Sequence, residues 1–118
     1  MARRHGVTEF LQSFESIGST FFDLEVDLLV VLDEKGNIER VNDAFERALD
    51  RQESEVLGQG IIHLVRMDDW AAFLNAFTAV QPAPFRLLRK DSGDVGVRLI
   101  ACRFIKRRGF LVLRKVTG

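Results

Sequence analysis

Two different spacings of apolar residues along the chain predict which segments are helices and which are strands. Between residues 8 and 22, apolar side chains recur every three or four positions, which places them along one stripe of an amphipathic helix. Thr8 is suited to cap the start of this helix. We expect the stripe either to join the core or to bind a second copy of the chain. It consists of Phe10, Leu11, Phe14, Ile17 and Phe21.

Residues 28–41 have the pattern of a β-hairpin. Residues 28–32 are an unbroken aliphatic run, residues 33–36 have turn chemistry that ends on Gly36, and residues 38–41 resume as a strand. Because the first strand is apolar on both faces, we expect it near the centre of a sheet.

Short helices are predicted after the hairpin. Asn42 or Asp43 offers a side-chain oxygen to the free amides at the start of the first one. Gly58 and Gly60 make a single long helix unfavourable, so we expect short helical turns over residues 54–65.

A second proper helix is predicted to begin at Asp68, whose carboxylate is a good cap. Four apolar residues follow at the spacing i, i+3, i+4, i+7, so they share one face, which we expect to be buried. The two prolines in residues 81–84 are expected to end this helix. The shared face consists of Trp70, Phe73, Leu74 and Phe77.

The last third of the chain has the pattern of an antiparallel meander. Residues 85–90, 95–105 and 110–116 read as strands separated by turn segments. With the hairpin, these segments predict a five-stranded antiparallel sheet with helices packed on one face, an α+β fold. No repeat or linker interrupts residues 1–118, so we expect a single domain.

Length and composition fit one globular domain. With 118 residues, of which 47% are hydrophobic and 29% charged, the chain has enough material for one hydrophobic core. Its 17 basic and 17 acidic side chains leave no net field to attract nucleic acid or an anionic membrane. Basic residues do gather near the C-terminus, where they form a partner surface or guard exposed strands against edge pairing. They are Arg103, Lys106, Arg107, Arg108, Arg114 and Lys115.

The cysteine count and the hydropathy of the chain indicate its cellular compartment. The single cysteine, Cys102, has no partner for an internal disulfide, and the chain contains no charged-then-apolar leader or long apolar run. We therefore expect a cytoplasmic domain that makes no membrane contact itself, even if its parent protein is anchored in a membrane.

The ordered series of elements and local motifs resembles the PAS family of sensory domains. Residues 29–38, Leu-Val-Val-Leu-Asp-Glu-Lys-Gly-Asn-Ile, look like the first hairpin of that family. Residues 41–45, Val-Asn-Asp-Ala-Phe, look like its strand-to-helix step, and residues 55–58, Glu-Val-Leu-Gly, are similar to its leucine-glycine step. The resemblance implies a bacterial signalling module, with the PAS core over residues 26–117 and the N-terminal helix flanking it.

The chain departs from the pattern of the PAS family in two places. Arg66 and Met67 stand where the family often has histidine and proline. Residues 115–117, Lys-Val-Thr, stand where many members close with aspartate, an aliphatic residue and threonine. In the family that aspartate helps to couple the sheet to a following signalling helix. The resemblance therefore implies signal coupling through Lys115 and Thr117, with the charge reversed.

The reactive side chains form no constellation that predicts catalysis or metal binding. Cys102 lies in a predicted strand among apolar residues, so we expect an inert thiol, and the cysteine motif of photoadduct-forming PAS domains is absent. His63 could ligate haem iron, but the usual ligand in haem-binding members lies on the long helix, so we expect a structural or surface role. His5, His63 and Cys102 lack the spacing of metal ligands.

Ten apolar residues are candidates for lining a ligand pocket between helices and sheet. Their aromatic members could flank a flat ring such as flavin, a small apolar or organic ligand could lie among them, or they could simply fill the space. No polar groups suited to the edge of a flavin are identifiable, so we expect no cofactor, with haem or flavin as the alternatives. The candidates are Phe45, Leu49, Leu57, Ile61, Trp70, Phe73, Leu74, Phe77, Phe85 and Leu99.

The leading function is that of a non-catalytic sensory and dimerisation module, which passes a ligand, redox or contact signal to an effector domain of the same polypeptide. The effector could be a histidine kinase of a two-component system, a cyclic-dinucleotide enzyme or a transcription regulator. We expect a homodimer through residues 8–22. The rivals are a haem- or flavin-binding sensor, a small enzyme with His63, Asp68 or Glu55 as general base, and nucleic-acid binding at Phe104 and Phe110.

Overall fold

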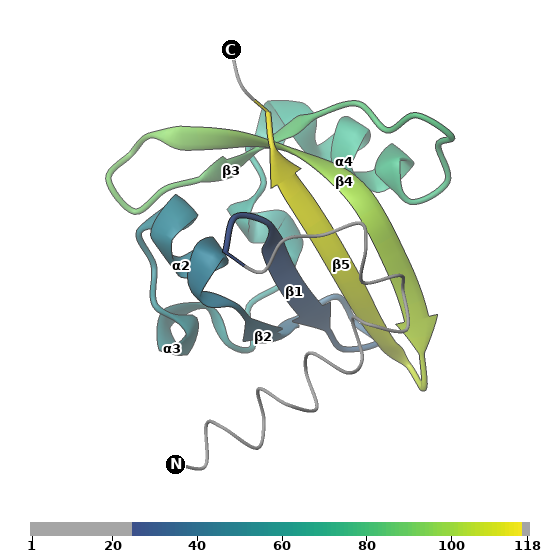
Figure 1. The fold of residues 1–118 in the computed structure, drawn as a ribbon, viewed down its shortest axis with the longest axis horizontal. Coiled ribbons are helices and arrows are strands. Elements are labelled where there is room, and N and C mark those ends of the chain that lie inside the picture. The colour runs from purple at the N-terminus through teal and green to yellow at the C-terminus, as the bar shows by residue number, and fades with distance from the viewer. Residues whose placement is uncertain (1–24, 117–118) are drawn as a thin grey trace.

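The computed structural model describes residues 25–116. They form a five-stranded antiparallel sheet in the order β2-β1-β5-β4-β3 (Figure 1). The first and last strands of the chain are therefore neighbours, which confirms the predicted hairpin, meander and central position of the first strand. The predicted helix at residues 8–22 lies outside the described residues. The strands are β1 (Leu28–Leu32), β2 (Ile38–Val41), β3 (Phe85–Leu88), β4 (Asp94–Ile105) and β5 (Arg108–Lys115).

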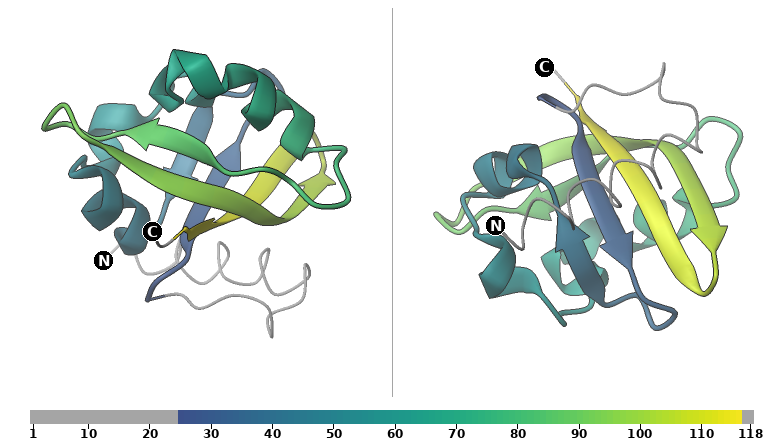
Figure 2. Two further views of the ribbon diagram at one scale, coloured as in Figure 1. Left: turned by 90° about the horizontal axis from the view of Figure 1, so that it is seen from above. Right: turned by 60° about the horizontal axis from the view of Figure 1, so that its bottom comes forward.

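The helical elements between β2 and β3 are all short, and they pack on one face of the sheet (Figure 2). Two of them fall within residues 54–65 or overlap them, as Gly58 and Gly60 predicted. The elements are the α-helices α2 (Asp43–Leu49), α3 (Glu53–Val56) and α4 (Trp70–Ala76), and the 3-10 helices η2 (Ile61–Leu64) and η3 (Met67–Asp69).

Asn42 caps α2 and ties it to the sheet. Its side-chain oxygen accepts hydrogen bonds from the backbone N–H of Phe45 at 3.1 Å and of Leu29 at 3.0 Å. Its amide nitrogen donates to the carbonyl of Asp27 at 2.9 Å. Of the two capping candidates in the sequence, the structure therefore selects Asn42, because only an amide side chain combines an acceptor for α2 with a donor for the start of β1.

The predicted start of the second helix is wrong. Residues 67–69 form the 3-10 helix η3, and Asp69, not Asp68, occupies the N-cap position of α4 without a side-chain cap bond. The carboxylate of Asp69 binds the backbone and guanidinium of Arg86 on β3 instead. A cross-element ion pair therefore replaces the local cap that the sequence suggested.

Two further predictions for this helix are also wrong: that it extends to the proline segment, and that its whole apolar face is buried. α4 ends at Ala76, before the proline segment, because the N–H groups of Thr78 and Ala79 both bond to the carbonyl of Asn75 and close the helix in a turn. Phe73 is buried, but Leu74 is 57% exposed, since it lies at the margin of the contact with the sheet.

Both faces of the sheet are apolar. The period-two alternation of β1 sends Leu28, Val30 and Leu32 into the cluster beneath the helices and sends Leu29 and Val31 to the opposite face. The same alternation divides β5. The strands of a sheet with one solvated face would carry polar residues at every second position, so this sheet has two buried surfaces.

A bulge in β4 determines which of its apolar residues lie on each face of the sheet. Leu99 pairs with Leu113 and Ala101 pairs with Val112, so Ile100 is the extra residue. Ile100 and Ala101 therefore both lie with the cluster on the face opposite the helices.

The turns of the meander differ from the predicted ones by a few residues. β3 ends at Leu88, because the N–H of Arg89 bonds to the carbonyl of Gly93 and closes the turn early. Only Lys106 and Arg107 connect β4 to β5, with φ angles of 49° and 66°. A two-residue turn with positive φ at both positions matches the twist of the flanking strands.

Candidate functional site

The interior between the sheet and the helices is filled by the protein's own side chains. Phe45 and Phe85 are fully buried, and Leu49 and Leu99 belong to the same cluster. The ring of Phe73 meets the ring of Phe85 edge to face at a centroid distance of 5.2 Å. A flat cofactor in this space would have to displace these rings from a close-packed core.

Two other predicted pocket residues are less buried than these: Trp70 at the edge of the interior and Leu57 on the surface. Trp70 is half-buried at the start of α4, where its indole N–H donates to the carbonyl of Val65 at 2.9 Å. Leu57 follows α3 and is 45% exposed. Trp70 nevertheless packs against the core cluster that contains Phe45 and Phe85.

The remaining predicted pocket residues line an open groove beside α4, which we call the α4 groove. It has a volume of about 590 Å³. Buried side chains of Leu32, Ile61 and Phe73 are at its base. Leu74 of α4 lines it, as does Phe104 of β4, which is 67% exposed. The groove has the size and the mostly apolar lining that are typical of a small-molecule site.

Charged residues line the end of the α4 groove that lies at the β1–β2 and β4–β5 turns. They are Asp33, Glu34, Lys35 and Arg107. The carboxylate of Asp33 accepts hydrogen bonds from the backbone N–H groups of Asn37 at 2.9 Å and of Lys35 at 2.8 Å, and these bonds, chiefly the one from Asn37, lower the pKa of Asp33. The groove is thus apolar along its length and ionic at one end.

Sequence reasoning did not place Phe104 and Arg107 in a pocket. Phe104 is two residues after Cys102 on β4, and the period of two sends both side chains toward the helix-covered face. Phe104 lies at the margin of the helix layer, where its ring is 6.3 Å from that of Phe77 at the end of α4. The alternation in β4 was the available signal, but only the register of the sheet brings Phe104 beside α4.

The sheet face opposite the helices carries a second apolar cluster, which we call the outer face. Its buried members are Leu29, Val31, Phe110 and Val112, with Ile100, Ala101 and Ile105 packed around them. Among residues 25–116, no helix contributes a side chain to this cluster. Phe110, a nucleic-acid candidate in the sequence, is therefore a buried member of an apolar surface.

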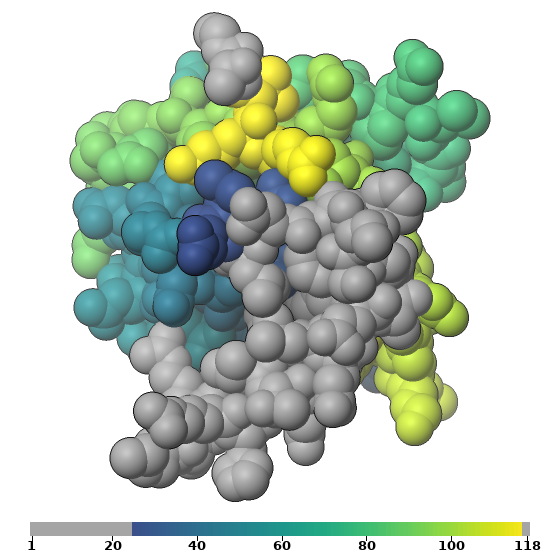
Figure 3. All heavy atoms as spheres, viewed as in Figure 1, coloured from purple at the N-terminus to yellow at the C-terminus, as the bar shows by residue number. Residues whose placement is uncertain are grey.

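An ion pair joins the beginning of the sheet to its end. The carboxylate of Asp27, which is 2% exposed, accepts two hydrogen bonds of 3.0 Å from the Nε and Nη2 atoms of Arg114. The end of β5 and the segment before β1 lie side by side on the surface (Figure 3). Of the predicted coupling residues, Lys115 is exposed at the end of β5, and Thr117 lies outside the described residues.

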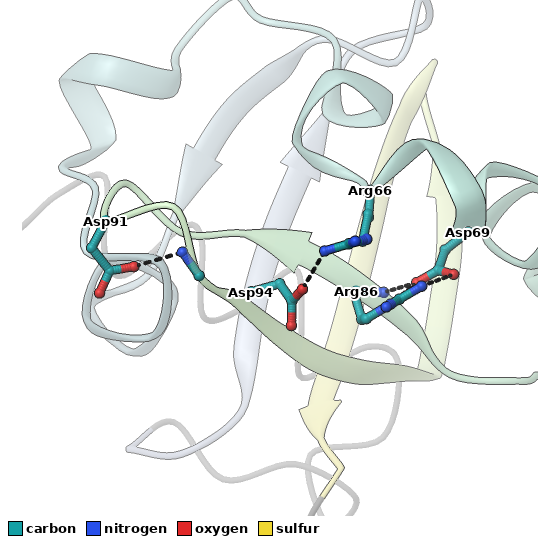
Figure 4. A network of polar contacts seen from close by, with 6 residues as sticks. Arg66, Asp69, Arg86, Asp91 and Asp94 are labelled. Carbon is teal, nitrogen blue, oxygen red and sulfur yellow. Dashed lines mark hydrogen bonds and ion pairs between the residues drawn. The ribbon is translucent and has the colours of Figure 1, made fainter.

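A second set of ion pairs holds η3 against β3 and β4 (Figure 4). The guanidinium of Arg86 binds both carboxylate oxygens of Asp69, at 2.7 and 3.0 Å, and these bonds hold the pKa of Asp69 below its ordinary value. Arg66 donates to Asp94 at 2.9 Å. Each charge in this set has a partner across elements, so the arrangement positions the helices and leaves no activated acid or base.

The remaining candidates for chemistry are separated from one another. Cys102 is half-buried on β4, and burial raises the pKa of its thiol, which disfavours the reactive thiolate. His63 is exposed on η2. Over residues 25–116, no three metal-ligating side chains gather as a metal site would require. Within the same range, no helix has the length and apolar character needed to cross a bilayer.

Comparison with protein families identifies the fold. The family model described as the PAS fold matches residues 18–84, more than half of the chain. The chain belongs to the PAS family. PAS domains are typically sensory modules of signalling proteins and are generally non-catalytic, and the helix-covered five-stranded sheet agrees with this assignment.

Solved PAS structures share the fold. The PAS domain of an HTR-like protein from Haloarcula marismortui is 24% identical, with a TM-score of 0.62, and the match covers 89% of this chain and 99% of that one. The PAS domain of the quorum-sensing receptor RpfR from Cronobacter turicensis, solved in complex with BDSF, is 19% identical, with a TM-score of 0.57 and coverage of 77% and 94%. At these identities the likeness concerns the fold. A search of curated proteins finds no match.

Proposed function

We propose that this PAS domain is a non-catalytic sensory and dimerisation module of a bacterial, cytoplasmic signal-transduction protein. Its output domain, in the same polypeptide, would be a histidine kinase, a cyclic-dinucleotide enzyme or a transcription regulator. The input is the binding of a small ligand or a change in the contacts with a partner. The output is a changed arrangement of the flanking segments.

The apolar outer face carries this proposal. Leu29 and Val112 at its centre are fully buried, although no described helix reaches them. An antiparallel sheet that is apolar on both faces requires a cover on each, because exposed clusters of this kind are sites of association. The sequence of residues 8–22 has an amphipathic stripe with three phenylalanines, and we propose that this stripe provides the homodimer interface.

The packed interior favours association over a resident cofactor. A haem or flavin would need the space that Phe45, Phe73 and Phe85 occupy, and no cluster of polar groups lines that space to bind its edge. We expect the freshly purified protein to be colourless in its absorption spectrum. A Soret or flavin band would instead favour the haem- or flavin-sensor reading.

The test of the dimer is the double substitution Phe14→Glu and Ile17→Glu in the 118-residue chain. Each Phe or Ile buried at an interface contributes roughly 1.5–3 kcal/mol, and a two-fold interface counts each contact twice. We therefore expect the variant to be monomeric in sedimentation velocity at concentrations where the wild type is a dimer.

The matched control is Gln12→Glu with Ser16→Glu, which adds the same charge on the opposite side of the predicted helix. The control should remain dimeric. If Phe14→Glu/Ile17→Glu sediments as the wild type does, residues 8–22 are not the interface.

A further inference from the structure

Five arginines lie around the apolar centre of the outer face. Residues directly opposite each other in an antiparallel pair share one face of the sheet, and Arg40 on β2 is opposite Val31 of the outer face. Arg103 on β4 is opposite Phe110, another member of that face. Three more arginines of β4 and β5 lie on this side by the same register and by the period of two. The five, which we call the arginine border, are Arg40, Arg98, Arg103, Arg108 and Arg114.

Arg98 has no carboxylate to neutralise it within residues 25–116. Three other members of the arginine border each have one carboxylate partner: Arg40, Arg108 and Arg114. Arg98 is exposed, makes no ion pair with a described residue, and lies directly opposite Arg114 in the ladder between β4 and β5. Like charges at opposite positions of two strands repel each other, so a carboxylate supplied from outside this range would stabilise the pair.

An amphipathic helix with acidic flanks matches this surface. An apolar centre that contains an aromatic side chain and is bordered by arginines has the composition of a protein–protein interface. The occupant must therefore be apolar along one side and carry carboxylates beside that side. Residues 8–22 meet both conditions, because their only charged side chains are Glu9 and Glu15, and both are acidic. In a helix, these two carboxylates lie about 120° from the centre of the apolar stripe, one on each side of it.

The dimensions of the two surfaces also agree. A helix of residues 8–22 is about 22 Å long, and β5, with 8 residues, spans about 27 Å. The strand order places β2 on one side of β1 and β5 and places β4 on the other side. Arg40 and Arg103 are therefore on opposite margins of the apolar centre, where carboxylates on the two sides of one helix can pair with both.

We propose that the arginine border selects residues 8–22 of a second copy of the chain as the occupant of the outer face, with Glu9 and Glu15 paired to border arginines. This inference rests on the proposed dimer, and it adds the surface on which the stripe packs and the charges that determine the choice of partner. Each chain gives its segment to the sheet of the other, so the contact occurs twice about a two-fold axis. A helix with lysines at its flanks would be rejected by repulsion.

The test reverses the charges on each side in turn. The sheet variant carries Arg98→Glu and Arg103→Glu, and the segment variant carries Glu9→Arg and Glu15→Arg. Like charges then face each other at both contacts, so the dimer dissociation constant of each variant alone should rise about a hundredfold in sedimentation equilibrium. In an equimolar mixture opposite charges meet again at both contacts, and native mass spectrometry should detect the heterodimer.

The matched control is Lys35→Glu with Lys90→Glu, which makes the same change of charge in two turns away from the outer face. The control should dimerise as the wild type does. Arg98→Gln with Arg103→Gln removes the two charges without reversing them and should weaken the dimer less, by about tenfold. Recovery of the dimer in the mixture also shows that both charge-reversed variants are folded.

Two results would overturn the inference. A sheet variant that dimerises as tightly as the wild type removes the outer face from the interface, while the Phe14→Glu/Ile17→Glu variant still decides whether residues 8–22 form the dimer. Recovery in a single chain that carries all four reversals, without recovery in the mixture, places the contact within one chain and removes the second copy from the outer face. A wild type that is monomeric throughout removes the proposed dimer itself.

Discussion

Asp27 and Arg114 show how one residue pair connects the two ends of the described chain. The carboxylate is buried, whereas the guanidinium reaches it from a half-exposed position. Removal of the cation therefore leaves a buried carboxylate without its bidentate partner, while removal of the carboxylate leaves a cation that water can hydrate.

We predict that Arg114→Met lowers the free energy of unfolding more than Asp27→Asn does, by roughly 2–4 kcal/mol against 1–2 kcal/mol. Urea denaturation of both variants measures the difference. Arg98→Met is the control, because Arg98 lies opposite Arg114 on β4 and is exposed. If Arg114→Met and Arg98→Met lower the free energy of unfolding equally, the ion pair with the buried Asp27 contributes no more to stability than an exposed arginine does.

Asp69 makes the stability depend on pH. Hydrogen bonds from Arg86 lower the pKa of Asp69 in the folded protein below its ordinary value of 3.8. The carboxylate therefore stabilises the fold above that ordinary value, and its contribution is lost as the pH falls through the lowered pKa of the folded state.

We predict that the difference in unfolding free energy between the wild type and Asp69→Asn shrinks as the pH is lowered from about 6 to about 2. Urea denaturation at a series of pH values tests this. Asp68→Asn, at the exposed neighbouring position, controls for the loss of a charge. A difference for Asp69→Asn that stays constant over the whole range would contradict the role of its ion pair with Arg86.

At the scale of elements, Asn42 organises three segments with one side chain. Three hydrogen bonds of this side chain reach Phe45 in α2, Leu29 in β1 and Asp27 before β1. A loss of the cap alone typically costs about 1 kcal/mol, and the other two bonds contribute about 1 kcal/mol each.

We predict that Asn42→Ala lowers the free energy of unfolding by about 2–3 kcal/mol. Asn42→Asp keeps the acceptor for Phe45 and Leu29 but loses the donor to Asp27, so its loss should be smaller. Thermal and urea unfolding give both values. If Asn42→Asp is as damaging as Asn42→Ala, the acceptor role assigned to the side-chain oxygen is incorrect.

The β4–β5 hairpin is the element on which the site depends most. The bulge at Ile100 sets which side chains of β4 face the helices, and the tight turn at Lys106 and Arg107 sets where the rim of the groove lies. Gly109 permits the ring of Phe104 to lie close to β5, because a Cβ there would meet that ring at 3.0 Å. The shape of the α4 groove therefore depends on backbone geometry outside the groove as well as on its lining.

For the molecule as a whole, the sheet separates two surfaces of different character. The helix-covered side contains the packed core and, at its margin, the α4 groove, whereas the outer face is apolar and faces away from every described helix. A ligand at one surface and a partner at the other would communicate through β4 and β5, which contribute residues to both. The charge-reversal experiment tests the outer face alone.

Local physical chemistry determined most of the fold. The unbroken aliphatic run of β1, the turn before Asn37 and the asparagine at the start of α2 each express a preference that acts over a few residues. Their order was enough to predict the five-stranded sheet and the resemblance to PAS domains. The packed Phe45 and Phe85 also follow from apolar residues on predicted faces.

The tertiary structure decided what depends on contacts between distant residues. Asp27 forms an ion pair with Arg114, 87 positions later in the chain. Asp69, at the N-cap position of α4, binds Arg86 on β3 and makes no side-chain cap bond. The ring of Phe104 lies 6.3 Å from that of Phe77 only because the strand order and the bulge in β4 bring the two segments together. Local spacing predicts the face on which a side chain lies, but the partner across that face depends on strand register and packing, which the whole chain sets at once.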